Sequence, residues 1–190
     1  MALCLAQLPE ADALLERDPF ALITGMILDQ QFAMERAFAG PYIIATRLEM
    51  KKLVPARIAA MEPAAFAAIC SQVPAIHRYP GSMAKRIQLL AGKVENDYEG
   101  RTEAIWTGVK TGVDLFGRLK ELPGFGEQKS RIFVALLGKQ LGVRPRGWRE
   151  AAGHYGEHGS RRSIADVTSP KTLAEVRAFK QELKAAARKG

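Results

Sequence analysis

The sequence predicts an all-α protein, and three observations support that prediction. Apolar residues recur at helical spacing along most of the chain, most clearly in residues 20–32 and 80–100. Few segments alternate apolar and polar residues, so no sheet is expected. Several helical stretches carry a proline near their start, where its missing N–H removes no helical hydrogen bond. Roughly ten short helices are therefore expected.

The first strong helix signal is the pair Asp18-Pro19, an N-cap residue followed by proline at the first helical position. Apolar residues then continue to Phe32 at helical spacing. The pattern resumes over residues 33–50, where Gly40-Pro41 predicts a local bend or break because proline removes a helical hydrogen bond.

The middle of the chain predicts three further helices. Residues 54–61 and 62–73 form two short alanine-rich segments, each with a proline near its start. Residues 80–100 give a longer helix that Ser82 is expected to cap. Its core face is indicated by apolar residues at i, i+3 and i+7, namely Ile87, Leu90 and Val94.

The C-terminal third begins with a helix over residues 113–120 and another that follows a glycine turn. Residues 142–163 are rich in Gly, Arg and His, and predict a loop with one short helix at 148–153. Residues 169–190 predict a closing amphipathic helix. Its apolar residues near one face are Leu173, Val176, Phe179 and Leu183.

Composition places the chain among globular proteins of the reducing cytoplasm. Hydrophobic residues make up 47% and charged residues 25% of the 190 residues, enough for a core. Cys4 and Cys70 stand far apart, which predicts neither a disulfide framework nor a metal site. The N-terminal stretch lacks a basic region and reaches an acid at Glu10, which argues against a secretory signal, and no apolar run is long enough for a membrane span.

The positive charge of the chain is concentrated in its last third. The net charge is +8, yet residues 129–190 hold 14 Lys and Arg against 5 Asp and Glu, whereas residues 1–128 hold 14 against 15. A one-sided basic segment of this kind suits a polyanion, with nucleic acid as the first candidate. The alternative is a basic surface that faces solvent.

The basic segment begins inside the stretch "ELPGFGEQKSR", which predicts a tight turn between two helices. Pro123 disfavours helical geometry at the residue before it, and Gly124 and Gly126 tolerate positive φ. The helix that restarts at Glu127 presents free backbone N–H groups to the turn, a suitable site for one anion. A dinucleotide fingerprint does not fit, because Lys129 replaces its third glycine and no strand precedes it. The remaining alternative is a plain helical hairpin.

The stretch "LPGFGEQKSRIFVALLGKQLG" resembles the helix–hairpin–helix element of the HhH-GPD superfamily of base-excision DNA glycosylases. "LITGMILDQQF" is similar to the segment of that family in which a glutamine follows an apolar helix, and "YPGSMAKRIQLLAGKVENDYEG" is similar to its later helix. The three segments occur in the family's order over residues 18–142. The resemblance implies an all-α helix–hairpin–helix fold with two helical lobes flanking a DNA-binding cleft. One six-helix-like lobe would span 18–135, and 1–17 plus 136–190 would form the other.

The resemblance also implies which residues bind duplex DNA. The hairpin turn of Gly124, Phe125 and Gly126 would hold one phosphate through its backbone, a contact that fixes register. The next helical turn would add DNA contacts from Lys129, Ser130 and Arg131. Gln31, with Gln30 beside it, would fill the gap left by a flipped nucleotide, because the glycosidic carbon is inaccessible in a stacked duplex. The alternative for both glutamines is a polar helix end in solvent.

The catalytic residues depart from the family pattern. Family members that also cleave the strand place a nucleophilic lysine where this chain has Gln128, and Lys129 points about 100° away from that position on a helix. A monofunctional enzyme that uses water is therefore expected. The family's aspartate in the loop after the hairpin is missing, which leaves Glu150 and Asp29 as candidate acids. Either could instead pair with an arginine.

Few other residues suggest a ligand. Trp148 and Tyr155 are candidates to stack on a flipped base, or to anchor the core instead. The four cysteines that hold an iron–sulfur cluster in some family members are absent after Cys70, so no cofactor and no metal are expected. The expected protein is a monomeric base-excision DNA repair glycosylase of the cytoplasm, associated with the nucleoid. The alternative is a non-catalytic helix–hairpin–helix protein that recognises damaged duplex DNA.

Overall fold

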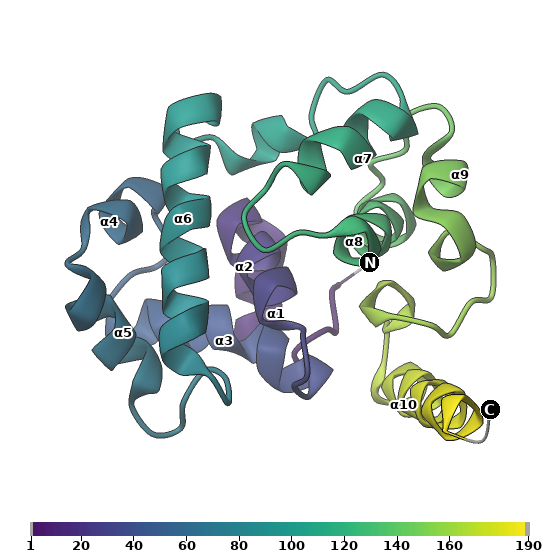
Figure 1. The fold of residues 1–190 in the computed structure, drawn as a ribbon, viewed down its shortest axis with the longest axis horizontal. Coiled ribbons are helices and arrows are strands. Elements are labelled where there is room, and N and C mark those ends of the chain that lie inside the picture. The colour runs from purple at the N-terminus through teal and green to yellow at the C-terminus, as the bar shows by residue number, and fades with distance from the viewer. Residues whose placement is uncertain (1, 189–190) are drawn as a thin grey trace.

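The computed structural model describes residues 2–188, and these residues are helical with no sheet. Ten α-helices and three short 3₁₀ helices account for the regular structure of this range, together with one isolated bridge between Thr111 and Arg146. The all-α prediction is confirmed. Figure 1 shows helix α2 near the middle of the molecule, α4 to α6 on one side and α7 to α10 on the other.

The centre of the fold is α2 (Pro19–Leu28), in which every residue from the second onward is buried. Asp18 caps this helix as predicted: its Oδ1 accepts hydrogen bonds from the backbone N–H of Phe20 at 3.0 Å and Ala21 at 3.1 Å. Its other carboxylate oxygen accepts from the N–H of Leu53 at 2.6 Å. The cap therefore fixes a distant loop as well as the helix.

Helices α1 (Pro9–Arg17) and α3 (Met34–Arg47) pack against α2. Of the predicted bend or break at Gly40-Pro41, the break is wrong, since α3 continues as one helix through both residues. A Cβ atom at Gly40 would lie 2.4 Å from the Leu28 side chain. Glycine therefore lets the two helices approach closely, and the burial that results outweighs the hydrogen bond that Pro41 removes.

Helices α4 (Pro55–Ala60) and α5 (Pro63–Ser71) cover one side of the long helix α6 (Pro80–Tyr98), as Figure 1 shows. The predicted cap at Ser82 is wrong, because the helix already begins with Pro80 at its first position. Proline has its φ preset for a helix start, so α6 begins three residues earlier than a cap at Ser82 would place it.

The predicted helical hairpin joins α7 (Gly112–Lys120) to α8 (Glu127–Gln140), and the short helix η1 (Thr102–Ile105) precedes it. Gly124 adopts a φ of +81°, which glycine tolerates without steric cost. Phe125 is buried and packs edge-on against Phe133 with 5.9 Å between ring centroids. The turn is thereby anchored to the core by the side chain between its two glycines.

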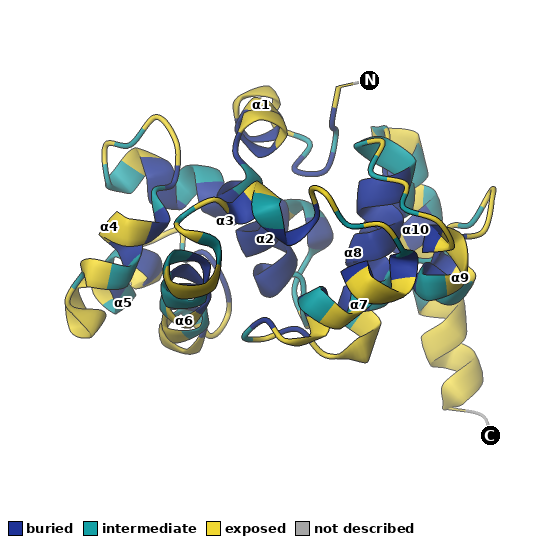
Figure 2. Ribbon diagram, turned by 90° about the horizontal axis from the view of Figure 1, so that it is seen from above, coloured by how far each residue is buried: buried dark blue, intermediate teal, exposed yellow. Residues whose placement is uncertain are grey.

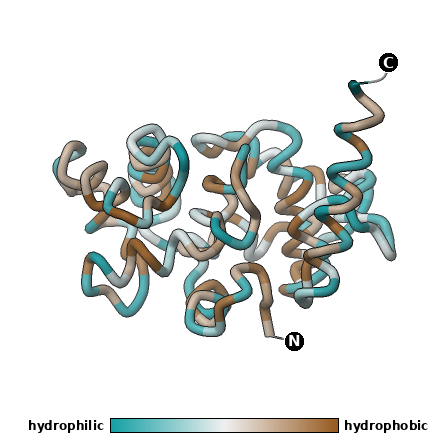
Figure 3. The backbone as a smooth tube through the Cα atoms, turned by 90° about the horizontal axis from the view of Figure 1, so that it is seen from below, coloured by the Kyte–Doolittle hydropathy of each residue, from teal (hydrophilic) through white to brown (hydrophobic). Residues whose placement is uncertain are grey.

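The remaining chain wraps around α8 and ends in a helix that projects from the rest of the molecule. It contains α9 (Trp148–Ala152), the 3₁₀ helices η2 (Gly153–Tyr155) and η3 (Ile164–Asp166), and α10 (Pro170–Ala187). The described residues after Lys180 are all exposed, as Figure 2 shows, and the projection of α10 is also visible in Figure 3. The predicted apolar face of α10 is therefore buried at Leu173 and Val176 but not at Leu183, which is 50% exposed.

Candidate nucleic-acid interface

A cavity of about 1360 Å³ lies where the loop after α2, the start of α8, the α9–η2 segment and α10 meet. Of the described residues that line it, six are Lys or Arg and two are Asp or Glu. The basic ones are Arg78, Lys129, Arg162, Arg177, Lys180 and Lys184. The cavity is thus positively charged, and residues far apart in the sequence form its walls.

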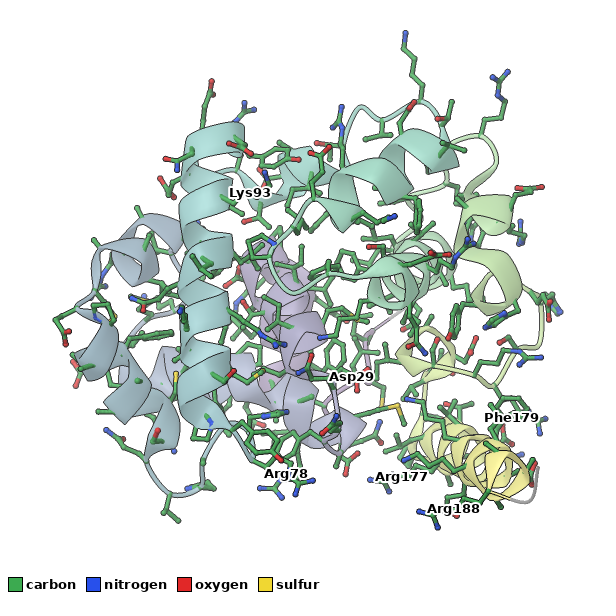
Figure 4. The ribbon with its side chains drawn as sticks, in the orientation of Figure 1. Asp29, Arg78, Lys93, Arg177, Phe179 and Arg188 are labelled. Atoms are coloured by element: carbon green, nitrogen blue, oxygen red, sulfur yellow. The ribbon has the colours of Figure 1, made fainter. Side chains whose placement is uncertain are left out.

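Asp29, one of the two predicted acids, lines this cavity at the C-terminal end of α2. Burial raises the pKa of its carboxyl group, whereas the nearby ammonium groups of Lys180 and Lys129 act in the opposite direction. In the view of Figure 4 it lies between Arg78 on one side and Arg177 on the other. A carboxylate in a cation-lined cavity is a candidate for proton transfer or charge stabilisation.

Lys129 contributes a second ionisable group to the same cavity. Its Nζ donates a hydrogen bond to the carbonyl oxygen of Ile27 at 2.6 Å, near the end of α2. Burial lowers the pKa of Lys129 to about 8, with Asp29 opposing that shift and Arg86 adding to it. The side chain therefore joins the first turn of α8 to the last turn of α2.

The predicted pair Gln30 and Gln31 also lines the cavity, but the two residues differ in their contacts. The Gln30 side chain accepts a hydrogen bond from Arg86 at 2.9 Å, and its backbone carbonyl contacts His77 Nε2 at 2.9 Å. Gln31 is exposed, with a φ of +50° that side-chain-bearing residues rarely adopt. Gln30 is thus held in place, and Gln31 is the member of the pair that faces solvent.

His77 is a structural residue of this loop that the sequence did not single out as important. It is 2% exposed, and its Nδ1 accepts a hydrogen bond from the Tyr79 N–H at 3.1 Å. Because Nδ1 is an acceptor there, Nε2 carries the proton and donates to the Gln30 carbonyl. Burial lowers the pKa of His77, which favours this neutral form.

Both glycines of the hairpin line the cavity and are exposed. Gly126 is the N-cap of α8 and no side chain caps the helix there, so its first-turn N–H groups face outward without a side-chain partner. The backbone of the turn is therefore exposed at Gly124 and Gly126, where free N–H groups of a helix start can bind an anion. Phe125 can contribute its backbone alone, since its side chain is buried.

Two residues of the next turn that the sequence predicts as DNA contacts make side-chain contacts within the protein. Ser130 is fully buried, and its hydroxyl donates to the Gly126 carbonyl at 2.9 Å. Arg131 pairs with Glu127 at 2.9 Å and also donates to the Ala151 carbonyl at 3.3 Å. Neither prediction could take account of the helices that pack beside α8.

The candidates from the loop after α8 separate into one residue at the cavity and two outside it. Tyr155 lines the cavity, and its hydroxyl accepts a hydrogen bond from Gln128 at 3.0 Å. Trp148 is buried beneath Gly138, where a Cβ would lie 2.3 Å from the indole ring. Glu150 is exposed on α9 and does not line the cavity. Of the two carboxylates predicted from the sequence, Asp29 lines the cavity and Glu150 does not, and Trp148 is not part of its wall.

Helix α10 forms a wall of the cavity that the sequence did not predict. Arg177 makes an ion pair with Glu35 of α3, and Lys180 Nζ lies 3.2 Å from the sulfur of Met34. Arg177, Lys180 and Lys184 all line the cavity. Their spacing of three and four residues places them on one face of the helix.

Comparison of the chain with protein-family models, with curated proteins and with solved structures found no match. Within residues 2–188, no helix combines the length and apolarity that a membrane crossing requires. The same range holds no group of three or more His, Cys, Asp or Glu side chains placed to hold a metal ion.

Proposed function

We propose that this protein is a DNA N-glycosylase that hydrolyses the bond between a damaged or mispaired base and its sugar in duplex DNA. The observation that carries the proposal is the meeting of Asp29, Gln31 and the hairpin glycines in one positively charged cavity. In this proposal residues 18–135 form one lobe, residues 1–17 and 136–190 form the other, and the duplex lies between them.

Each wall of the cavity has a part in DNA binding under this proposal. The exposed turn at Gly124 and Gly126 binds one phosphate through backbone N–H groups. The basic face of α10 binds phosphates on the opposite side, since duplex DNA carries a charge every ~1.7 Å along its axis. Gln31 enters the stack, because it is exposed at the tip of the loop after α2.

Asp29 acts on the sugar of the flipped nucleotide. Breaking the glycosidic bond leaves positive charge on the sugar, which a nearby carboxylate stabilises while it orients and deprotonates the attacking water. Burial raises the pKa of Asp29, and the ammonium groups of Lys180 and Lys129 oppose that shift in favour of the ionised form that this role requires. Gln128 stands at the position where strand-cleaving members of the family carry a lysine, so in this proposal water serves as the nucleophile and the enzyme is monofunctional.

The test is a panel of duplexes that each carry one damaged or mispaired base, incubated with the protein and then treated with alkali. We expect abasic sites in at least one duplex, lost in Asp29→Asn and retained in Glu150→Gln. Glu150 is the matched control because it is an exposed carboxylate outside the cavity. Binding without abasic sites across the panel would instead identify a damage-recognition protein. A covalent adduct between protein and DNA, trapped by borohydride, would show that an amine of the protein and not water is the nucleophile.

A further inference from the structure

The charges around Asp29 bear on which bases the cavity accepts. Lys129 from α8 and Lys180 from α10 are both half-buried, and both act electrostatically on the Asp29 carboxyl group. Arg177 lines the cavity one helical turn before Lys180. Glu35 also acts on Asp29 and pairs with Arg177, so three cations face two carboxylates there, and water screens these charges less than it screens an exposed surface.

Bases differ in the charge that they carry away from the sugar. An uncharged base, such as uracil or hypoxanthine, leaves with the electron pair of the broken bond and departs as an anion unless it is protonated. A purine alkylated on a ring nitrogen is already a cation in the nucleotide and departs neutral. Positive surroundings stabilise an uncharged base as it departs with negative charge. They repel a cationic alkylated purine before its bond to the sugar breaks.

The aromatic residues of the cavity do not offer the open face that binds a cationic base. The Arg36 guanidinium lies 4.8 Å from the centroid of the Phe32 ring, so a cation already occupies that face. Tyr155 is 8% exposed, and its hydroxyl is bonded to Gln128. Neither Phe32 nor Tyr155 therefore offers a free ring for a cation–π contact with an alkylated base.

Lys129 has the donors that a departing base needs. An ammonium group has three N–H donors, and the Ile27 carbonyl takes one of them. Burial lowers the pKa of Lys129 to about 8, so the group is charged at neutral pH and yields a proton more readily than an exposed lysine does.

We propose that the cavity excises uncharged bases that depart as anions, in preference to positively charged alkylated purines, with Lys129 and Lys180 stabilising the departing base. This inference rests on the proposed glycosylase function. The bond from the sugar carbon to the base nitrogen breaks, and its electron pair stays on the base. Water adds to the sugar carbon and loses a proton to Asp29, while the base takes up a proton from Lys129, which solvent replaces.

The experiment compares three duplexes of one sequence that contain a single uracil, hypoxanthine or N7-methylguanine. Excision is followed under single-turnover conditions with saturating protein, and each rate is divided by the spontaneous rate of the same duplex. We expect an acceleration for uracil or hypoxanthine that exceeds the one for N7-methylguanine by about tenfold or more. A greater acceleration for N7-methylguanine would overturn the inference and leave the glycosylase proposal standing.

Lys180→Gln tests the role of the cavity charge in the excision step, because saturating protein removes the effect of DNA affinity on the rate. It should lower the rate for the uncharged lesion by about tenfold and leave the N7-methylguanine rate unchanged or higher. Lys171→Gln, an exposed lysine of the same helix outside the cavity, should change neither rate. An equal loss for both lesions in Lys180→Gln would refute the inference. No excision of any of the three lesions would refute the inference, whereas the proposed function fails only if the whole lesion panel yields no abasic site.

Discussion

Lys129 Nζ donates a hydrogen bond to the Ile27 carbonyl oxygen at 2.6 Å. The two residues are 102 positions apart in the sequence, and their bond joins α8 to α2. The bond occupies one of the carbonyl groups that the C-terminal end of a helix leaves without an intrahelical partner. It also brings the ammonium group beside Asp29. The hairpin and the candidate acid are therefore held together by one side chain.

The lowered pKa of Lys129 predicts how the free energy of unfolding depends on pH. Between pH 8 and 10.5 the unfolded chain binds more protons at this lysine than the folded chain does, so folding becomes more favourable as pH rises. Relative to Lys129→Met, the wild-type protein should gain on the order of 2–3 kcal/mol across this window. Urea unfolding of both proteins at the two ends of the window measures the gain. A difference that does not vary with pH would contradict the burial of this ammonium group.

Gly126→Leu should abolish duplex binding without unfolding the protein. A Cβ at Gly126 meets nothing within 4 Å and its φ is −93°, so a side chain is accommodated in the free protein. The same side chain would lie where a phosphate approaches the first-turn N–H groups of α8. Gly117→Leu is the matched control, an exposed glycine of α7 that is equally unobstructed. Affinity for a labelled duplex and the melting temperature distinguish the two effects, and unchanged affinity in Gly126→Leu would refute the phosphate site.

Removing two positive charges from the basic face of α10 should weaken duplex DNA binding and make the affinity less sensitive to salt concentration. Each phosphate contact contributes about 0.9 to the slope of log affinity against log salt concentration. The double substitution Arg177→Gln and Lys184→Gln, two residues of that face that line the cavity, should therefore reduce the slope by about two. Lys171→Gln, on another face of α10, should leave it unchanged. Equal slopes for the double variant and the wild type would show that α10 does not contact DNA.

Asp18→Ala should lower the free energy of unfolding markedly, because Asp18 is a buried polar residue. The buried carboxylate accepts hydrogen bonds from three backbone N–H groups, and alanine leaves all three without that partner. The expected loss is about 2–4 kcal/mol in the free energy of unfolding. Asp18→Asn keeps one acceptor oxygen and should lose less. Chemical denaturation of the two variants checks that order, and an equal loss would argue against the contact with Leu53.

Local chemistry predicted the parts of the fold that depend on neighbours in sequence. Asp18-Pro19 specifies a helix start, and Gly124 with Gly126 specifies the turn, because cap and turn preferences act within a few residues. Gly40-Pro41 misled the prediction, since the packing of Leu28 against Gly40 is a contact between helices that no local rule describes.

The site was harder to predict for the same reason. Asp29 and the hairpin were identified by their sequence contexts, whereas α10 is placed as a wall by contacts between distant residues, such as the ion pair of Arg177 with Glu35, 142 residues away. Trp148 and Glu150 lie in the loop where the resemblance places a catalytic group. The close packing of Trp148 on Gly138 instead directs that segment away from the cavity.

The ion pair between Glu35 and Arg177 has a consequence for how α10 meets a ligand. Its guanidinium side chain is 48% exposed, and a pair so accessible to water contributes about 0–1 kcal/mol. Beyond Lys180 the described part of the helix has no buried residue to hold it in place. An arriving phosphate therefore competes with one carboxylate for a cation that is already half in solvent. Glu35 is only 21% exposed, so giving up this cation would leave a largely buried carboxylate without its partner, and a ligand that takes Arg177 must offset that loss.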